Sequence, residues 1–152
     1  MFAERGGKEF RVADYTVVPV SSVPDMASEV GMDPDHFEIR FMRESLGLKN
    51  FAVTYERFGG GWTAPKGHAH RRGHRHTVQE EVYFLVSGQA QGKFDGEIVD
   101  IEPWTAIRVA PETARSFRAA SKEDAIFVSI AAPQAGIDDV EFLPDFWEDT
   151  AG

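Results

Sequence analysis

The sequence predicts an all-β fold, a sandwich or barrel built from short antiparallel strands. Runs of alternating residues, or of β-branched and aromatic residues, recur at regular spacing with turn residues between them. The pair Asp95-Gly96 separates two such runs and is a strong signal for a two-residue hairpin. No long segment shows the apolar period of a helix. Strands of this length and spacing are typical of sandwiches and barrels.

The strands become regular only after the first 36 residues. Before that point we expect a loose arm over the first dozen residues, a short strand over 14–20 that ends at Pro19, and a single helical turn over 24–30. The later strands are expected over 37–41, 51–58, 82–86, 89–94, 97–101, 106–109, 116–118 and 125–131. Three glycines, 59–61, form a flexible turn after the second of them.

The chain of 152 residues is expected to form one domain with one hydrophobic core. The barrel core covers about residues 37–132, the N-terminal arm and strand cover 1–36, and an acidic, aromatic tail covers 133–152. No internal repeat or linker divides the chain. The tail's aromatic side chains would form a costly exposed patch, so we expect them to cover either a second copy or the chain's own barrel.

The composition of the chain argues against several classes of partner and of chemistry. The net charge of -9 disfavours nucleic acid and anionic membranes as partners. No apolar run is long enough to span a membrane, and the N-terminus lacks the apolar region of a secretory signal. The chain has no cysteine, which excludes disulfides, thiolate metal sites and cysteine nucleophiles. We therefore expect a cytoplasmic protein.

Charge is distributed unevenly on this acidic chain. The histidine-rich stretch also carries Lys66, Arg71, Arg72 and Arg75, whereas residues 137–149 hold six acids and no Lys or Arg. One interpretation is that both are solvated surface segments. The other is that the basic stretch faces an acidic ligand, or the acidic tail of a neighbouring subunit.

A metal site is predicted at His74, His76 and Glu81. Side chains two residues apart share one face of a strand, so both imidazoles point the same way. If the strand that ends at Gly88 runs beside the histidine strand, Glu81 can reach over both of them. Two imidazoles and one carboxylate suit divalent Fe, Mn, Ni, Co or Zn. The alternatives are a solvated polar loop, or a site in which His68 and His70 replace or join the later pair.

Two segments resemble the motifs of the cupin superfamily. Residues 73–88 are similar to its first motif, which reads His-x-His, three or four residues, Glu, six residues and Gly. Residues 103–118 are similar to its second motif in a degenerate form. The resemblance covers roughly residues 50–132. It implies a jelly-roll barrel of two antiparallel sheets, commonly a dimer, with a site in the mouth of the barrel.

The resemblance also implies a ligand set of two His, one Glu and a later His, for which this chain has Arg115 in the last position. An arginine stays protonated and cannot bind a metal. Three outcomes are open for it: a three-ligand metal site with open positions, an anion receptor in which Arg115 binds a carboxylate or phosphate, or an ion pair with Glu81. Tyr83 is expected either to line the core or to contact the ligand.

Two classes of function follow. The first is a small cupin-type barrel that binds a divalent metal, a small acidic ligand, or both, and whose reaction the sequence does not specify. The second is a non-catalytic, metal-free module that binds a small anion or serves as a structural dimer. A homodimer is expected in either case, on the basis of the resemblance.

Overall fold

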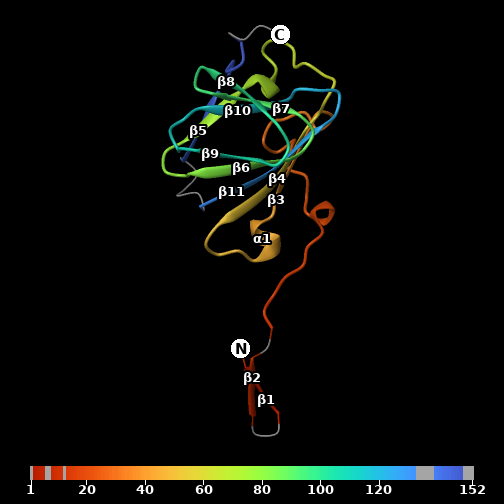
Figure 1. Cartoon of the computed structure of the whole chain (residues 1–152), viewed down its shortest axis with the longest axis vertical. Helices are drawn as coiled ribbons and strands as arrows, with labels where there is room; N and C mark the ends of the chain where they lie inside the picture. Colours follow the sequence, from red (N-terminus) through yellow and green to blue (C-terminus); the bar gives the residue numbers. More distant parts are fainter. Residues whose placement is uncertain (1, 6–7, 12, 133–138, 149–152) are drawn as a thin grey trace.

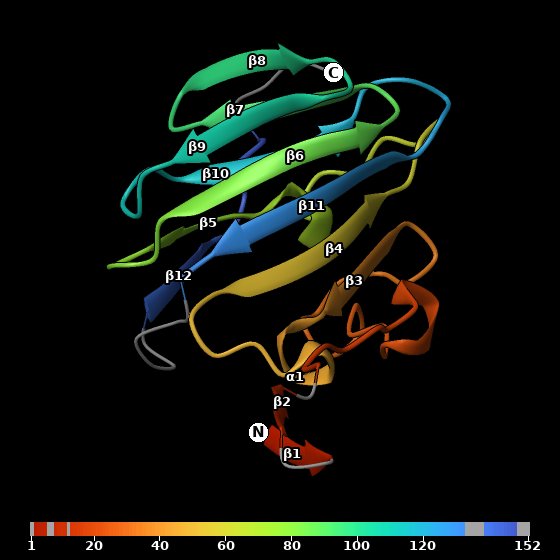
Figure 2. The ribbon, with the colours of Figure 1, turned by 60° about the horizontal axis from the view of Figure 1, so that its bottom comes forward.

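The computed structural model describes residues 2–5, 8–11, 13–132 and 139–148. Two five-stranded antiparallel sheets face each other (Figures 1 and 2). In spatial order, the first sheet consists of β3 (Phe37–Phe41), β4 (Ala52–Phe58), β11 (Ala125–Ala131), β6 (Glu81–Ser87) and β9 (Thr105–Val109). The second consists of β12 (Val140–Leu143), β5 (Gly73–His76), β10 (Arg115–Ala119), β7 (Ala90–Phe94) and β8 (Glu97–Ile101). The predicted all-β fold of two antiparallel sheets is confirmed.

Helical structure is sparse in the described part of the chain. It consists of α1 (Arg43–Leu46) and two short 3-10 helices, η1 (Val20–Ser22) and η2 (Ala69–Arg71). The helical turn expected over 24–30 is present, because the Val30 amide donates to the Met26 carbonyl at 3.0 Å. No helix among these described residues is long and apolar enough to cross a membrane.

Two N-terminal expectations were wrong. The segment expected to be a loose arm contains the paired strands β1 (Phe2–Arg5) and β2 (Lys8–Arg11), which lie apart from the large sheets in Figure 1. The strand expected over 14–20 does not form. Tyr15 and Val17 alternate as a strand requires, but both are about 80% exposed, so no sheet face buries them.

The barrel core lies between the two sheets. Tyr83, Leu85 and Phe127 are at most 2% exposed and pack with Phe117. The Phe117 ring lies 4.8 Å from that of Phe127 and 4.6 Å from that of Tyr83. Burying one such side chain contributes about 1.5 to 3 kcal/mol. These residues fill the middle of the barrel.

Tight turns hold consecutive strands in register. Asp95 has the left-handed φ of 50° that a two-residue hairpin needs, and β7 and β8 pair on either side of it as predicted. Gly88 ends β6 with a φ of 80°, and a Cβ there would lie 2.2 Å from the Asp124 carbonyl oxygen. Only glycine fits this position.

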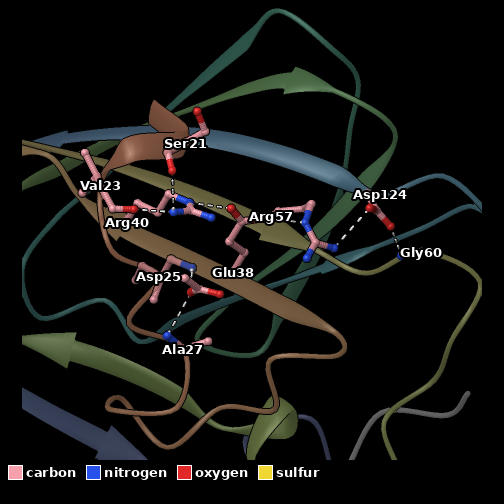
Figure 3. A network of polar contacts seen from close by, with 10 residues as sticks. Ser21, Val23, Asp25, Ala27, Glu38, Arg40, Arg57, Gly60 and Asp124 are labelled. Atoms are coloured by element: carbon pink, nitrogen blue, oxygen red, sulfur yellow. Dashed lines mark hydrogen bonds and ion pairs between the residues drawn. The ribbon is translucent and has the colours of Figure 1, made fainter. Parts of the chain in front are cut away.

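A polar network covers the outer face of the first sheet (Figure 3). Arg57 Nε donates to Glu38 at 2.9 Å, and its NH1 donates to Asp124 at 3.2 Å. Asp124 also accepts from the Gly60 amide at 2.9 Å, and Glu38 pairs with Arg40 at 2.5 Å. Burial alone would raise the pKa of Glu38, but these two arginines outweigh it and lower that pKa. The network ties β3, β4 and the turn before β11 together.

The described part of the tail folds back over its own barrel, as one of the two alternatives predicted. Strand β12 pairs with β5, and Arg75 Nε contacts Glu141 at 2.6 Å. Trp147 is 1% exposed, and its Nε1 donates to Ser116 Oγ at 2.8 Å. The acidic tail therefore contacts the basic stretch within one chain. A homodimer stays a prediction.

Candidate metal centre

The three predicted metal ligands come from opposite sheets. His74 and His76 lie on β5, whose neighbours are β12 and β10, whereas Glu81 begins β6, whose neighbours are β11 and β9. The condition considered from the sequence, that the strand ending at Gly88 runs beside the histidine strand, is therefore not met. Residues 77–80 carry the chain from one sheet to the other, so the side chains meet across the barrel interior.

The side chains nevertheless converge. His76 Nε2 lies 2.7 Å from Glu81 Oε1, and His74 Nε2 lies 3.5 Å from the same oxygen. The three ligand atoms all lie within 4.8 Å of one another. Ligands at 2.0 to 2.2 Å from one ion are themselves about 3 to 3.5 Å apart, so small shifts would accommodate a first-row divalent metal. Glu80 points the other way and pairs with Arg108 at 2.6 Å, as the alternation predicted.

Glu81 Oε1 gives a direct test of whether these residues fit a cation. This oxygen is buried and accepts no hydrogen bond within the described structure, although two imidazole nitrogens and a guanidinium surround it. A buried acceptor without a donor is costly in a folded protein. A cation bound between the carboxylate and the imidazoles would satisfy it. The donor set therefore fits a divalent metal.

The protonation states agree with this arrangement. Burial alone would raise the pKa of Glu81, but the imidazoles of His74 and His76 outweigh it and hold that pKa well below its usual range. Burial lowers the pKa of His74, despite the opposing effect of Glu81. An ionised carboxylate beside a neutral imidazole is the form in which both groups bind metals.

Asp139 contacts His76 at Nδ1, the ring nitrogen that does not face Glu81. Its Oδ2 lies 3.3 Å from His76 Nδ1, while its Oδ1 accepts from the amides of Thr77 and Val78 at 3.0 and 2.9 Å. A carboxylate at Nδ1 favours the tautomer whose proton is on Nδ1, which leaves the Nε2 lone pair directed at the site. The sequence offered only a weak signal for Asp139, as one of several acids in the tail.

Arg115 lies behind the site and is fully buried. Its guanidinium donates to the carbonyls of Pro111 and Ala110 at 3.1 and 3.2 Å, and its NH2 lies 3.8 Å from Glu81 Oε1. Arg115 does not line the cavity that opens in front of His74, His76 and Glu81. Direct binding of a ligand by Arg115 stays a prediction, and this geometry better fits a positive charge that holds Glu81 in place.

A cavity of about 490 Å³ opens in front of His74, His76 and Glu81. This volume is typical of sites for small molecules. Apolar side chains make up much of its wall, and its polar groups include Thr54, Glu56, Arg72, Gln79, Tyr83 and Ser129. Burial, followed by the charge of Glu81, raises the pKa of Tyr83 well above its usual value. Its role in ligand contact stays a prediction.

Glu56 is the second carboxyl group of this cavity, and sequence reasoning missed it. It lies on β4 in register with Ile39 and Phe127, on the face that also carries Thr54 and Phe58. Burial, and then the negative charge of Glu81, raises the pKa of Glu56 to about 8. Near neutral pH this side chain is mostly a neutral acid that can donate a hydrogen bond into the cavity. The alternation of its strand was its only sequence signal.

The alternative histidines, His68 and His70, are not grouped with Glu81, although His70 lines the same cavity. His68 Nδ1 accepts from the His70 amide at 3.2 Å, and His70 Nε2 accepts from the Asp33 amide at 3.1 Å. Burial, and then the neighbouring His68, lowers the pKa of His70 to about 4. The structure brings Glu81 together with His74 and His76, and does not group it with this earlier pair.

Comparison with known proteins identifies solved structures that have a similar fold. No protein-family model and no curated protein matches the sequence. A cupin protein from Bacteroides fragilis is 23% identical, with a TM-score of 0.59 over 83% of this chain and 89% of that chain. A predicted oxalate decarboxylase from Thermotoga maritima is 16% identical, with a TM-score of 0.58 over 77% and 98% of the two chains.

A cupin-2 domain protein from Rhodospirillum rubrum is 15% identical, with a TM-score of 0.58 over 87% of this chain and 82% of its own. Identities this low establish the fold and leave the activity open. The chain has the cupin jelly-roll fold that the two sequence motifs predicted.

Proposed function

We propose that this cupin-fold chain binds one divalent transition metal through His74, His76 and Glu81, and holds a small acidic molecule beside it. One observation carries the proposal: three metal-binding side chains converge on the wall of a cavity of about 490 Å³. Three protein ligands leave coordination positions for water or a ligand. When bound there, the ion would supply Lewis-acid polarisation of an oxygen ligand.

Cationic groups at the cavity support an acidic ligand. Arg72 and Arg43 line it, and the Arg72 guanidinium is held by the Val30 carbonyl and by the Phe142 ring, whose centroid is 4.5 Å away. A guanidinium fixed in this way loses little freedom when it binds a carboxylate. Arg72 thus takes the role in anion binding that the sequence suggested for Arg115, and neutral Glu56 supplies a hydrogen-bond donor from the first sheet.

A non-catalytic binding module is the second candidate, and Arg115 favours it. A guanidinium stands where the resemblance implies a fourth metal ligand, so any metal here has only three protein donors. The module would bind the same small acids without turnover. Thermal-shift screening of small acids, with and without metal, separates the two candidates: shifts that require metal support the first, and equal shifts in its absence support the second.

The metal proposal has a direct test. We expect metal-stripped protein to bind about one Zn²⁺ or Mn²⁺ per chain in calorimetric titration. The double variant His74→Ala/His76→Ala should lose this binding, because one carboxylate alone is a weak site. His68→Ala is the matched control, since it removes a nearby histidine outside the cluster, and it should bind as the parent does. Equal binding by the parent and the double variant would refute the site.

A further inference from the structure

A second cavity, of about 420 Å³, lies at the opposite end of the barrel from the metal centre. Strand β4 contributes Ala52 and Thr54 to the first cavity, and Phe58 with the glycines that follow it to the second. Likewise Ser129 and Ala131, late in β11, line the first, whereas Ser121 and Lys122, before β11, line the second. Phe58, His70 and Phe117 line both and form the wall between them.

Flat aromatic surfaces make up much of this second cavity. The Trp62 ring stacks on His36 with centroids 3.7 Å apart and planes 3° apart. The His70 ring meets Trp62 edge-on at 5.2 Å, and Trp147 contributes from the tail. Rings fixed by stacking and edge contacts present apolar faces to a planar ligand at low entropic cost.

The charged side chains among the described lining residues of this cavity are cationic. Arg71, Arg118 and Lys122 line it, and none of its described lining residues is Asp or Glu. Arg71 donates to the carbonyls of Ala64 and Trp147 at 2.7 and 3.4 Å and forms no ion pair within the described structure. Burial, and then the charge of Arg71, lowers the pKa of Arg118, so the two guanidiniums repel each other. An anion between them would offset this repulsion.

Both guanidiniums are held in place before any ligand arrives. The Arg118 guanidinium carbon lies 4.2 Å from the centroid of the Trp147 ring, and Arg118 Nε and NH2 donate to Gln91 Oε1 at 3.1 and 2.9 Å. Such a concentration of cations is notable on a chain of net charge -9. Aromatic faces and fixed cations in one cavity match a ligand that is both flat and negatively charged.

We propose that this cavity binds a small aromatic carboxylate, with its ring against Trp62 and its carboxylate facing Arg71, Arg118 and Lys122. The proposal does not depend on the metal centre, because the wall of Phe58, His70 and Phe117 separates the two sites.

Benzoate is the probe, titrated calorimetrically into metal-free protein at low salt with a chelator present. We expect saturable binding in the micromolar to millimolar range, much weaker binding of the neutral isostere benzamide, and much weaker binding of acetate, which lacks the ring. Saturation by benzamide at the same concentration as benzoate would overturn the charge requirement, and equal binding of acetate would overturn the aromatic one. The lack of saturable benzoate binding would overturn the proposal as a whole.

Variants of the chain test whether benzoate binds in this second cavity. Lys122→Gln should weaken benzoate binding about three- to fivefold, because one exposed cation is lost, whereas Lys49→Gln, at an exposed lysine outside the cavity, should leave it unchanged. Trp62→Leu should weaken it about fivefold through loss of the aromatic face. The His74→Ala/His76→Ala variant should bind benzoate as the parent does. Loss of benzoate binding in that variant would place the probe at the metal centre and contradict the second site.

Discussion

At the scale of single residues, Asp139 allows the sharpest test of how the proposed metal centre is organised. Asp139→Asn keeps a side-chain oxygen for the Thr77 and Val78 amides, but its NH₂ group cannot accept from His76 Nδ1. We expect Zn²⁺ affinity to fall about tenfold to a hundredfold, because His76 is no longer held in the tautomer and orientation that binds metal. Competition with a chromophoric chelator measures this.

Glu141→Gln is the matched control for that experiment. Glu141 belongs to the same tail segment and pairs with Arg75 on β5, but both side chains are about half exposed, so its loss should leave the metal affinity unchanged. Equal affinities for Asp139→Asn and the parent would show that the carboxylate has no orienting role.

The residues of the site differ in how well the sequence predicted them. His74, His76 and Glu81 could be predicted, because strand alternation fixes which side chains share a face. Asp139 and Glu56 could not, because their roles arise from contacts between strands far apart in the chain, β12 with β5 and β4 with the barrel interior. For Arg115 the sequence left three outcomes open, and its two carbonyl partners could not be foreseen from spacing.

At the scale of elements, the last turn of the tail anchors β12 to the second sheet. Trp147 Nε1 donates to Ser116, its backbone amide donates to the Arg71 carbonyl at 3.1 Å, and the ring is buried. Trp147→Ala should therefore lower the free energy of unfolding by about 3 to 5 kcal/mol. Urea denaturation followed by far-UV circular dichroism measures the loss without relying on tryptophan fluorescence.

The control for that prediction is Trp104→Ala. Trp104 is 80% exposed, and its backbone amide, which donates to the Leu85 carbonyl, is unaffected by the change. We expect its stability to stay within about 0.5 kcal/mol of the parent. If the two variants lost equal stability, the tail would not be an anchor.

The elements that sequence reasoning missed depend on pairing partners. The strand over 125–131 was predicted with its exact bounds, because its run of β-branched and aromatic residues is itself a strong strand signal. In the sheet it has a pairing partner on each side, β4 and β6. By contrast, β12 is a four-residue edge strand that exists through its pairing with β5. The segment over 14–20 has a strand-like pattern and no partner. Local alternation alone therefore does not decide whether a strand forms; a pairing partner is also needed, and edge strands that have one, such as β3 and β8, were predicted with their exact bounds.

At the scale of the whole molecule, the order of strands decides which groups meet. Residues 77–80 carry the chain from the second sheet to the first, so a carboxylate and two imidazoles close in sequence face each other across the interior. Strand side chains make up most of the lining of the cavity in front of these three residues. Two motifs in the sequence predicted this architecture, but the crossing itself had to be observed.

Opposing protonation equilibria make the stability of the whole molecule depend on pH. His70 and His74 have pKa values below their unfolded value, so they bind fewer protons when folded, and their contribution to stability rises with pH and is complete above about 6.5. Glu56 has its pKa raised to about 8, so it binds more protons when folded, and stability is lost between about pH 4.5 and pH 8.

Of these three groups, Glu56 is the one whose equilibrium remains active between about pH 6.5 and pH 8. For metal-free protein we therefore expect the free energy of unfolding to fall by about 1 to 2 kcal/mol over this interval, since one pKa unit corresponds to about 1.4 kcal/mol at most. Glu56→Gln keeps the neutral amide shape and should remove this fall. Urea denaturation at a series of pH values, with a chelator present, measures both proteins. A fall of the same size in the variant would mean that Glu56 is ionised in the folded barrel and that its surroundings are more polar than the packing of β4 against β11 and β3 implies.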